Sequence, residues 1–457
     1  PVPTVPSGMA TAWSDPSLWG GVLPGPNASV VIPAGRTVLL DTSTRIRNLT
    51  IEGTLLVAER DLRLEADWML VRDRGRLQAG TPSAPRRSRL ELVLTDGDRS
   101  ENAAGMGTKF FGAMAGVVEL HGARKTRWTR LDGTAAPGAS SIDVLDATGW
   151  QIGDRIAIAP TDFDPDEREV RSVTAIAGRR LTLDSPLQHQ HWGRIQTLGS
   201  TGEVMDQRAP VANLSSNIVI RGSTPTDAKF GGHVMFMGGA VTQLSNIEIT
   251  QMGQRGGLGR YPIHWHLNGN SPQSYLADSA VHSNFQRGIV VHRANDLTIR
   301  NNVVFDTFGH MIFIESSNEQ RNVFDGNLVM YGRPIPIADM NPEIAFEHRR
   351  GHHNPRGRIS GFWISNQNQV FRNNHVAAIH FGIGYWFVEG ASLTGEGQRD
   401  NDLWAFRGNG GAAPYRGPLV FENNVASVIR PSVEFGGSNP MDVNGNALQF
   451  DALACAH

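Results

Sequence analysis

The chain has 457 residues, of which 40% are hydrophobic, and its formal net charge at pH 7 is −2. This balance excludes a broadly basic surface of the kind that binds nucleic acid or anionic lipid. No apolar run approaches the roughly 18 residues of a membrane-spanning helix, so we expect no membrane span. The single cysteine, Cys455, excludes an intramolecular disulfide. The chain begins at Pro1 without methionine, as expected of a mature or trimmed protein.

Short apolar runs separated by Gly, Pro or Asn predict an all-β protein. IRNLTIEGTLLV (46–57), RLELVLTDGD (89–98) and NIVIRG (217–222) each read as strand and turn, without a long 3.6-residue periodicity. Asn-Asn pairs at 301–302, 373–374 and 423–424 each follow an apolar strand. Asparagine tolerates left-handed backbone and can stack its amides at a solenoid corner. We therefore expect a parallel β-helix, right-handed like other parallel crossover connections.

The chain divides into three expected parts. Residues 1–131 form an N-terminal β module, 132–200 a small β insertion, and 201–457 the β-helix with the functional face. In the insertion Asp162, Asp164 and Asp166 alternate as in a calcium loop. The glycine and glutamate that such a loop needs at its sixth and twelfth positions are missing. We interpret this segment as a solvated acidic turn, with calcium as the alternative.

Two groups of motifs carry a resemblance to a known family. The first group is Trp13, Pro16, Trp19, Pro24, Gly25, Ile32, Pro33, Gly35, Val38 and Asp41, with GVVELHG at 116–122. The second is FGGHVMF (230–236), YPIHWHLNG (261–269), the Glu319–Asn322 run and FWISNQNQ (362–369). The first group resembles a G8 domain. That domain is the glycine-marked β module of the cell-migration-inducing hyaluronan-binding protein, its transmembrane relative and fibrocystin. The second group is similar to the β-helix of the hyaluronan-depolymerising proteins.

The resemblance implies a hyaluronan-depolymerising β-helix in a secreted, extracellular or periplasmic protein. One departure matters, because the animal hyaluronan proteins carry a large globular insertion after the segment that resembles HGARKTRWTRL (121–131). Only about a dozen residues separate Leu131 from the next strand here. Any residue that hyaluronan cleavage needs from that insertion would be missing.

Histidines recur on successive strand-like runs of the second half. In IHWHL, alternation places His264 and His266 on one face and Ile263, Trp265 and Leu267 on the other. Adding His233 and His292 from neighbouring turns predicts a site for zinc or a similar divalent metal, with an open position for water. The alternative is a hydrogen-bonded histidine ladder without metal.

Further candidates flank these histidines. Glu315, at the end of the strand MIFIE, is the expected acid or base, with His310 and Arg260 as further catalytic candidates. A strand-end glutamate paired with Arg321 is the alternative for Glu315. Hydrolysis usually needs a second carboxylate, for which Asp339, Glu343 and Glu347 are candidates. Elimination needs only a base and a group that neutralises a uronate.

Substrate contacts are expected from Arg293, Trp265 and Asn268. Arginine suits bidentate capture of carboxylate or sulfate. Trp265, Trp363, Tyr385 and Trp386 either stack on sugars or fill the core. We predict a monomer that binds, and cleaves by hydrolysis or elimination, an acidic polysaccharide such as hyaluronan. The competing hypothesis is a non-catalytic carbohydrate-binding or surface scaffold.

Overall fold

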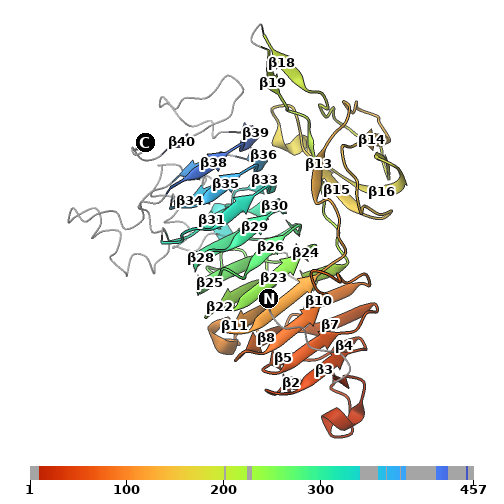
Figure 1. Ribbon diagram of the computed structural model, residues 1–457, viewed down its shortest axis with the longest axis vertical. Helices are drawn as coiled ribbons and strands as arrows, with labels where there is room; N and C mark the ends of the chain where they lie inside the picture. Colours follow the sequence, from red (N-terminus) through yellow and green to blue (C-terminus); the bar gives the residue numbers. More distant parts are fainter. Residues whose placement is uncertain are drawn as a thin grey trace, which may run out of the picture.

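A computed structural model describes residues 10–199, 202–223, 229–316, 318–339, 359–366, 368–380, 382–387, 418–430 and 449–450. Within these residues three parallel sheets of 11, 10 and 11 strands wind around one core (Figure 1). Successive strands of the chain pass from one sheet to the next, and each new turn pairs with the turn before it. The predicted right-handed parallel β-helix is confirmed.

The strand bounds follow, sheet by sheet. The first sheet contains β1 (Thr11–Ala12), β3 (Thr37–Leu40), β6 (Thr54–Val57), β9 (Arg76–Ala79), β12 (Val117–His121), β23 (Val241–Ser245), β26 (Tyr275–Ala277), β29 (Thr298–Arg300), β32 (Val323–Asp325), β35 (Val370–Arg372) and β38 (Val420–Glu422). The second contains β4 (Thr44–Arg45), β7 (Leu62–Ala66), β10 (Leu90–Leu94), β21 (Ile218–Gly222), β24 (Ile247–Thr250), β27 (Ala280–His282), β30 (Val303–Phe308), β33 (Leu328–Arg333), β36 (His375–His380) and β39 (Val425–Arg430). The third contains β2 (Ser29–Ile32), β5 (Asn48–Ile51), β8 (Trp68–Arg72), β11 (Phe110–Met114), β22 (His233–Met237), β25 (Ile263–Asn270), β28 (Ile289–Asn295), β31 (Ile312–Ile314), β34 (Ile359–Ile364), β37 (Gly382–Phe387) and β40 (Gln449–Phe450).

The N-terminal part belongs to the same solenoid. Strands β1 to β12 supply the first turns of all three sheets, and β10, β11 and β12 pair directly with β21, β22 and β23. Their inward residues, such as Leu64, Leu92 and Ile220, share one hydrophobic cluster. These N-terminal turns are therefore expected to be stabilised together with the later turns, because in the described residues one core runs through both.

The asparagines form the predicted corner ladder. Asn301, Asn373 and Asn423 adopt left-handed backbone with φ of 53°, 57° and 51°. The amide after each left-handed residue points inward, so the Nδ2 of Asn302 donates to Asn327 at 3.0 Å and that of Asn327 to Asn374 at 3.0 Å. Asn327 joins the ladder because Gly326 takes the left-handed position in that turn, with φ of 67°. The expected amide stacking is confirmed.

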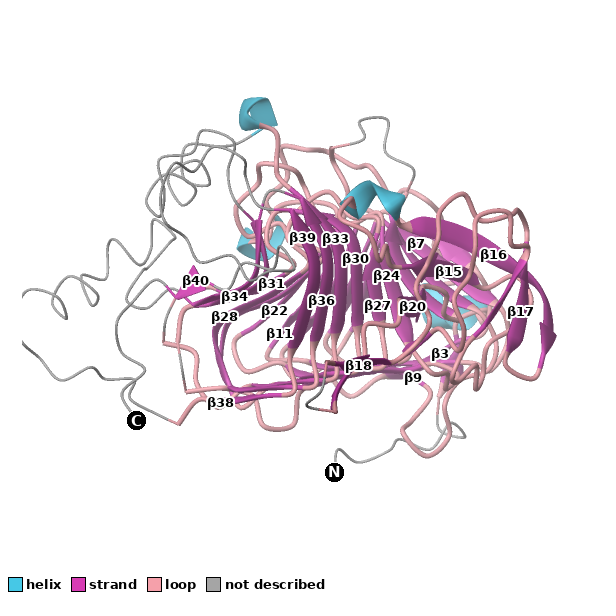
Figure 2. Ribbon diagram, turned by 90° about the horizontal axis from the view of Figure 1, so that it is seen from above, coloured by secondary structure: helices cyan, strands magenta, loops and turns pink. Residues whose placement is uncertain are grey.

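The insertion is a separate antiparallel sheet that extends beyond residues 132–200 at both ends. Its strands are β13 (Trp128–Arg130), β14 (Ser141–Asp143), β15 (Arg155–Ile158), β16 (Glu169–Ala177), β17 (Arg180–Leu183) and β20 (Pro210–Asn213), with the hairpin β18 (Gln196–Leu198) and β19 (Glu203–Met205). Seen along the long axis, β15, β16 and β17 lie to one side of the coil (Figure 2). The insertion has its own core, which includes Ile156, Val173 and Leu181.

The acidic turn of the insertion docks it on the solenoid. Asp166 accepts hydrogen bonds from Tyr331 Oη at 2.9 Å and from His380 Nε2 at 3.2 Å. Asp164 caps the short 3₁₀ helix η4 (Pro165–Glu167) by accepting from the backbone N–H of Asp166. Asp162 accepts from the N–H of Phe163. In the described part of the chain these carboxylates do not form a three-ligand group.

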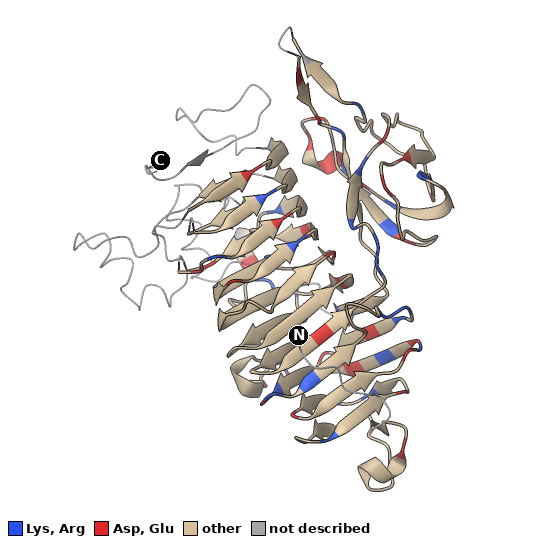
Figure 3. Cartoon of the chain, viewed as in Figure 1, with Lys and Arg blue, Asp and Glu red and all other residues tan. Residues whose placement is uncertain are grey.

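Other 3₁₀ helices are η2 (Pro16–Trp19), η3 (Ala103–Gly105) and η5 (Ile337–Asp339). In the described residues, none of the helices has the length and apolar character to cross a membrane. Positions of acidic and basic residues alternate along the early turns and the insertion (Figure 3). Arg76 pairs with Glu119 across neighbouring turns, and Arg221 pairs with Glu91 at 3.2 Å. In these pairs, charges of opposite sign neutralise each other between neighbouring turns.

Candidate metal centre

Three neighbouring strands of the third sheet carry the candidate site. In β25 the side chains of Ile263 and Trp265 enter the core, so His264 and His266 point outward, as predicted. His266 lies opposite His292 of β28 in register. Val291 lies opposite Ile314 of β31, and continuing that register puts Glu315 opposite His292.

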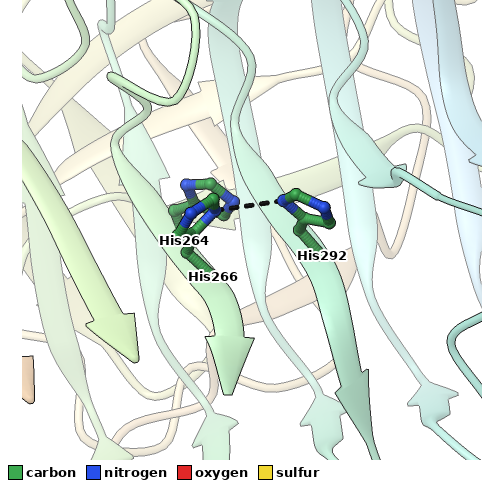
Figure 4. Close-up of side chains that lie close together, drawn as sticks. All are labelled: His264, His266 and His292. Carbon is green, nitrogen blue, oxygen red and sulfur yellow. Dashed lines mark hydrogen bonds between the residues drawn. The ribbon is translucent and has the colours of Figure 1, made fainter. Parts of the chain in front are cut away.

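The three imidazoles converge (Figure 4). One ligand nitrogen from each of His264, His266 and His292 lies within 4.8 Å of the others. The Nδ1 atoms of His266 and His292 are 3.0 Å apart and share a hydrogen bond. The rings of His264 and His292 are stacked with their centroids 6.0 Å apart. Three nitrogen ligands on rigid strands match the donor set of a divalent transition-metal site.

Glu315 adds a carboxylate to this group. Its Oε2 lies 3.7 Å from His264 Nε2 and 3.9 Å from His292 Nδ1. His264 and Glu315 are buried, with 0% and 2% of their surfaces exposed. Among the described residues, Nε2 of His264 has no hydrogen-bond partner. A buried ring nitrogen of this kind is costly unless a ligand or ion binds it.

The protonation of His264 favours ligation. Burial and the neighbouring imidazoles hold its pKa well below the usual range, while the carbonyl of Gly259, 3.3 Å from Nδ1, opposes this shift. The ring is therefore neutral at physiological pH, which is the form that binds metal. The set of residues fits a divalent cation.

Sequence reasoning missed Glu319. Its carboxylate accepts from the N–H of Arg293 at 2.7 Å and of Ser316 at 3.0 Å, the residues directly after His292 and Glu315. It thus joins the ends of two strands that carry site residues. Burial, with the nearby charge of Glu315, raises the pKa of Glu319 to about 7 despite these hydrogen bonds. Its place in the ESSNEQRN run was the only signal in the sequence.

Tyr261 and Arg287 were also missed. Nη1 of Arg287 donates to Tyr261 Oη at 3.1 Å, and both side chains are buried. The Tyr261 ring packs edge-on against His264 with centroids 4.9 Å apart. Burial raises the pKa of Tyr261 far above its usual range. Together they support the back of the His264 ring.

His233 does not join the three-histidine group, contrary to prediction. Met235, not His233, lies opposite His264, so His233 is two residues away along its strand. Its Nε2 bonds with the carbonyl oxygen of Met106 at 3.0 Å, and burial and the positive charge of Arg260 lower its pKa. The expected four-histidine site is corrected to three histidines with Glu315 beside them.

Arg260 is half-buried next to this region. Its guanidinium lies against Gly107, where an added Cβ would meet Nη2 at 3.0 Å. Among the described residues no carboxylate pairs with it. A cation without an acidic partner beside the histidines remains available to an anionic ligand.

His310 is held apart from the group by other partners. Its Nδ1 lies 2.9 Å from Ser360 Oγ and 3.1 Å from the Ser360 backbone nitrogen. Its ring packs on Phe313 and Trp363, with centroids 5.2 and 4.7 Å away. The structure does not bring His310 into the three-histidine group, so it gives no geometric support for a catalytic role.

Two expected substrate contacts need correction. Trp265 is completely buried, and its Nε1 donates to Thr242 at 3.0 Å, so it belongs to the core. Asn268 uses its amide on the backbone of Ala240 and on Ser271 Oγ, at 2.9 Å each. A register shift between His266 and Gly269 turns Asn268 into a solenoid corner and leaves Leu267 exposed rather than inward.

The remaining expectations divide between core and loops. Tyr385 lies in the core, whereas Trp363 and Trp386 are outward but buried in a second aromatic cluster. Arg321 pairs with Asp296 at 2.7 Å rather than with Glu315. Asp339 pairs with Lys229 and Arg255, which lower its pKa. Glu343 and Glu347 lie outside the described residues.

The family models match both halves of the solenoid. Residues 18–132 match the G8 domain, and residues 229–430 match the CEMIP β-helix. The chain carries a G8 domain and a CEMIP β-helix. The stretch between the two matches contains the antiparallel insertion except for its first strand, β13, which lies inside the G8 match. This confirms the resemblance that the tryptophan, glycine and histidine motifs indicated.

Curated relatives agree with this assignment. Fibrocystin-L is 32% identical over 425 residues in Mus musculus and over 423 in Homo sapiens, which covers 82% of this chain and 10% of each relative. A G8 domain-containing protein of Dictyostelium discoideum is 30% identical over 352 residues, or 72% of this chain and 30% of that protein. The chain thus spans a tenth to a third of the length of these relatives.

Solved structures give a weaker likeness. The Gp54 tailspike of Acinetobacter baumannii bacteriophage AP22, in complex with A. baumannii capsular saccharide, is 12% identical with a TM-score of 0.19. That match covers 80% of this chain and 65% of the tailspike. The Pseudomonas phage phi297 tailspike gp61 is 14% identical, also with a TM-score of 0.19. The fold assignment rests on the pairing of the chain's own strands.

Proposed function

We propose that the protein binds an acidic polysaccharide and cleaves it at a divalent-metal centre on the third sheet. The observation that carries the proposal is the convergence of His264, His266 and His292 within 4.8 Å, beside the buried carboxylate of Glu315. The CEMIP β-helix match over residues 229–430 supports a glycan as substrate, because the sequence motifs resemble hyaluronan-depolymerising proteins. We place this activity outside the cytoplasm.

Each residue has a distinct task in the proposal. The three imidazoles hold the cation, which when bound supplies Lewis acidity toward a uronate carboxylate or a water. Glu315, within 4 Å of two of these rings, takes or returns the proton. Arg260 binds the uronate carboxylate, and Arg293 supplies a second cation after His292.

Two routes use the same groups. In elimination, Glu315 takes the proton from the carbon next to the uronate carboxylate, and the bond from the neighbouring carbon to the glycosidic oxygen breaks. That oxygen leaves with the proton that Glu315 returns, and a double bond forms in the new non-reducing end. In hydrolysis, Glu315 takes the proton of the attacking water while a second acid protonates the leaving oxygen. Only Glu315 among the described carboxylates faces the imidazoles within 4 Å. This arrangement favours elimination.

The test is metal analysis together with a cleavage assay on the full chain. The purified protein should hold one equivalent of divalent metal, lose it to a chelator, and produce unsaturated ends from hyaluronan or another uronate polymer. Replacing His264 and His292 with Ala should abolish stoichiometric metal and reduce cleavage by orders of magnitude. His282→Gln, a buried histidine outside the group, is the matched control.

Different failures have different meanings. An active, metal-free native protein that is insensitive to chelator would contradict the metal centre. New reducing ends without unsaturation would contradict elimination and favour hydrolysis. Saccharide binding without cleavage of any uronate polymer would favour the scaffold hypothesis.

A further inference from the structure

The insertion and the end of the solenoid line a cavity that the proposed cleavage site does not use. Its volume is about 450 Å³, within the usual range for small-molecule sites. The insertion forms most of its wall, and Ser427 and Val428 of β39 complete it. The insertion lies beside β36 and β39 in Figure 1, along the second sheet, whereas the histidine group lies on the third.

Aromatic and amide side chains line this cavity, which we call the insertion groove. The residues that bear on the argument are Phe163, Gln188, Gln190, Trp192, Gln196 and Gln207. Phe163 is 77% exposed, which is high for a ring of its size. A lone exposed apolar residue is ordinary, but here the ring borders a concave site next to a tryptophan.

Trp192 is fixed in place before any ligand arrives. Its Nε1 donates to the carbonyl oxygen of Arg194 at 2.6 Å, and its backbone N–H donates to Thr161 Oγ1 at 2.9 Å. Thr161 in turn donates to the carbonyl oxygen of Gln190 at 3.4 Å. The ring is thus held by its own Nε1 hydrogen bond and by an anchored backbone, so it loses little conformational entropy when a ligand packs on it.

The four glutamine amides are available to a ligand. Among the described residues, the side chains of Gln188, Gln190, Gln196 and Gln207 make no hydrogen bond, although all four line the groove. Each amide offers two donors and an acceptor. Paired donors and acceptors beside an apolar ring match the alternating hydroxyls and apolar face of a pyranose.

The charge of the insertion groove selects against uronates. Asp162 and Glu167 line it, and its one titratable base is His189, whose Nδ1 lies 3.6 Å from Glu167 Oε1. No lysine or arginine is among the lining residues. Its two carboxylates outnumber its single imidazole, so the groove repels a carboxylate or sulfate.

From this geometry we infer that the insertion groove is a second carbohydrate-binding site that takes a neutral, hydroxyl-rich saccharide. The ring of Phe163 or Trp192 stacks on the apolar face of a sugar, and the glutamine amides bond its hydroxyl or acetamido groups. The site is independent of the proposed cleavage chemistry. It would hold a neutral glycan segment on one side of the solenoid while the histidine face acts on an acidic one.

The test is calorimetric titration of the full chain with chitotriose, cellotriose and mannotriose, with a hyaluronan tetrasaccharide as the acidic probe. At least one neutral trisaccharide should bind. Phe163→Ala, and separately Gln188→Ala with Gln190→Ala, should weaken that binding about tenfold, as expected for one lost aromatic contact or a lost amide pair. Ile152→Ala and Gln151→Ala are matched controls, because both residues are exposed on the insertion and lie outside the groove.

Three results would overturn the inference. Absence of binding by all three neutral trisaccharides at millimolar concentration would remove the site. Equal weakening by the Gln151 and Ile152 controls, or none by the groove variants, would place binding elsewhere. Tighter, Phe163-dependent binding of the hyaluronan tetrasaccharide would contradict the selection for neutral sugars. His292→Ala should leave trisaccharide binding unchanged, which separates this test from that of the cleavage site.

Discussion

Replacing Glu319 with Gln tests how the candidate metal centre is held together. The carboxylate joins the backbone after His292 to the backbone after Glu315, and burial raises its pKa from 4.5 to about 7. Because the folded-state pKa lies above the unfolded one, the contribution of this group to stability is complete below about pH 4.5. It is lost as the pH rises toward 7.

The magnitude follows from the shift. One pKa unit corresponds to about 1.4 kcal/mol, so ionised Glu319 costs the metal-free fold up to about 3 kcal/mol at pH 8. A glutamine keeps an acceptor oxygen and removes the charge, at a cost of about 1 kcal/mol for weaker hydrogen bonds. We therefore expect Glu319→Gln to stabilise the metal-free protein by about 1–3 kcal/mol at pH 8 and to change it little at pH 4.5. Metal affinity should fall about 10- to 100-fold, as for other residues that orient ligands.

The assay is urea unfolding in the presence of chelator at both pH values, followed by metal titration of each protein. Glu422→Gln is a suitable control, because this exposed glutamate of β38 lies far along the chain from the site. A stability change of the same size at pH 4.5 and pH 8 would refute the assignment of the raised pKa to Glu319. Unaltered metal affinity would refute its positioning role.

Three further predictions concern the scaffold. Asn302→Ala should cost about 2–4 kcal/mol in urea unfolding, because Ser279 N–H, the Leu276 carbonyl and Asn327 each lose a buried partner. The control is Asn301→Gly at the exposed neighbouring position. It should lower the free energy of unfolding by less than about 1 kcal/mol, because glycine adopts the left-handed backbone of Asn301. Burial lowers the pKa of His121 to about 4 and of His375 to about 3. The contribution of these neutral histidines to stability is therefore complete above pH 6.5, and the melting temperature should fall as the pH drops toward these values. His375→Gln should make that fall less steep. Trp265→Ala should cost about 3–5 kcal/mol as a core truncation, and an unchanged melting temperature with weaker glycan binding would contradict its core assignment.

The fold could be predicted because its signals are local and repeated. A strand of four to six residues, a glycine or asparagine corner and period-2 alternation specify the same unit in each turn. The Asn-Asn pairs gave the corner conformation directly, since their φ values and buried amides are properties of that dipeptide. The bounds of the insertion were less predictable, because β13 and β20 pair although residues 131–209 lie between them.

The metal set was harder to predict because it depends on register between turns. Gaps of 31, 26 and 18 residues between histidine-bearing runs give the order of the strands but not their alignment. The loops between these strands differ in length, so the sequence spacing does not fix the register. His292 lies opposite His266, whereas His233 is two residues away from the position opposite His264. Two residues of strand correspond to about 6.6 Å, more than the spacing between paired strands of about 4.8 Å. A displacement of this size is enough to keep His233 out of the three-histidine group.

The same argument explains the errors at Leu267 and Asn268. Alternation predicts Leu267 inside and Asn268 outside, provided that the strand stays regular. Left-handed backbone at Leu267, with φ of 51°, breaks the alternation directly after the second histidine. His266 is therefore the last regular β25 residue before the break, and it lies opposite His292 of β28. The proposed site sits where regular strand gives way to irregular backbone, so its strand-borne histidines were accessible to pattern reasoning and its loop-borne Glu319 was not.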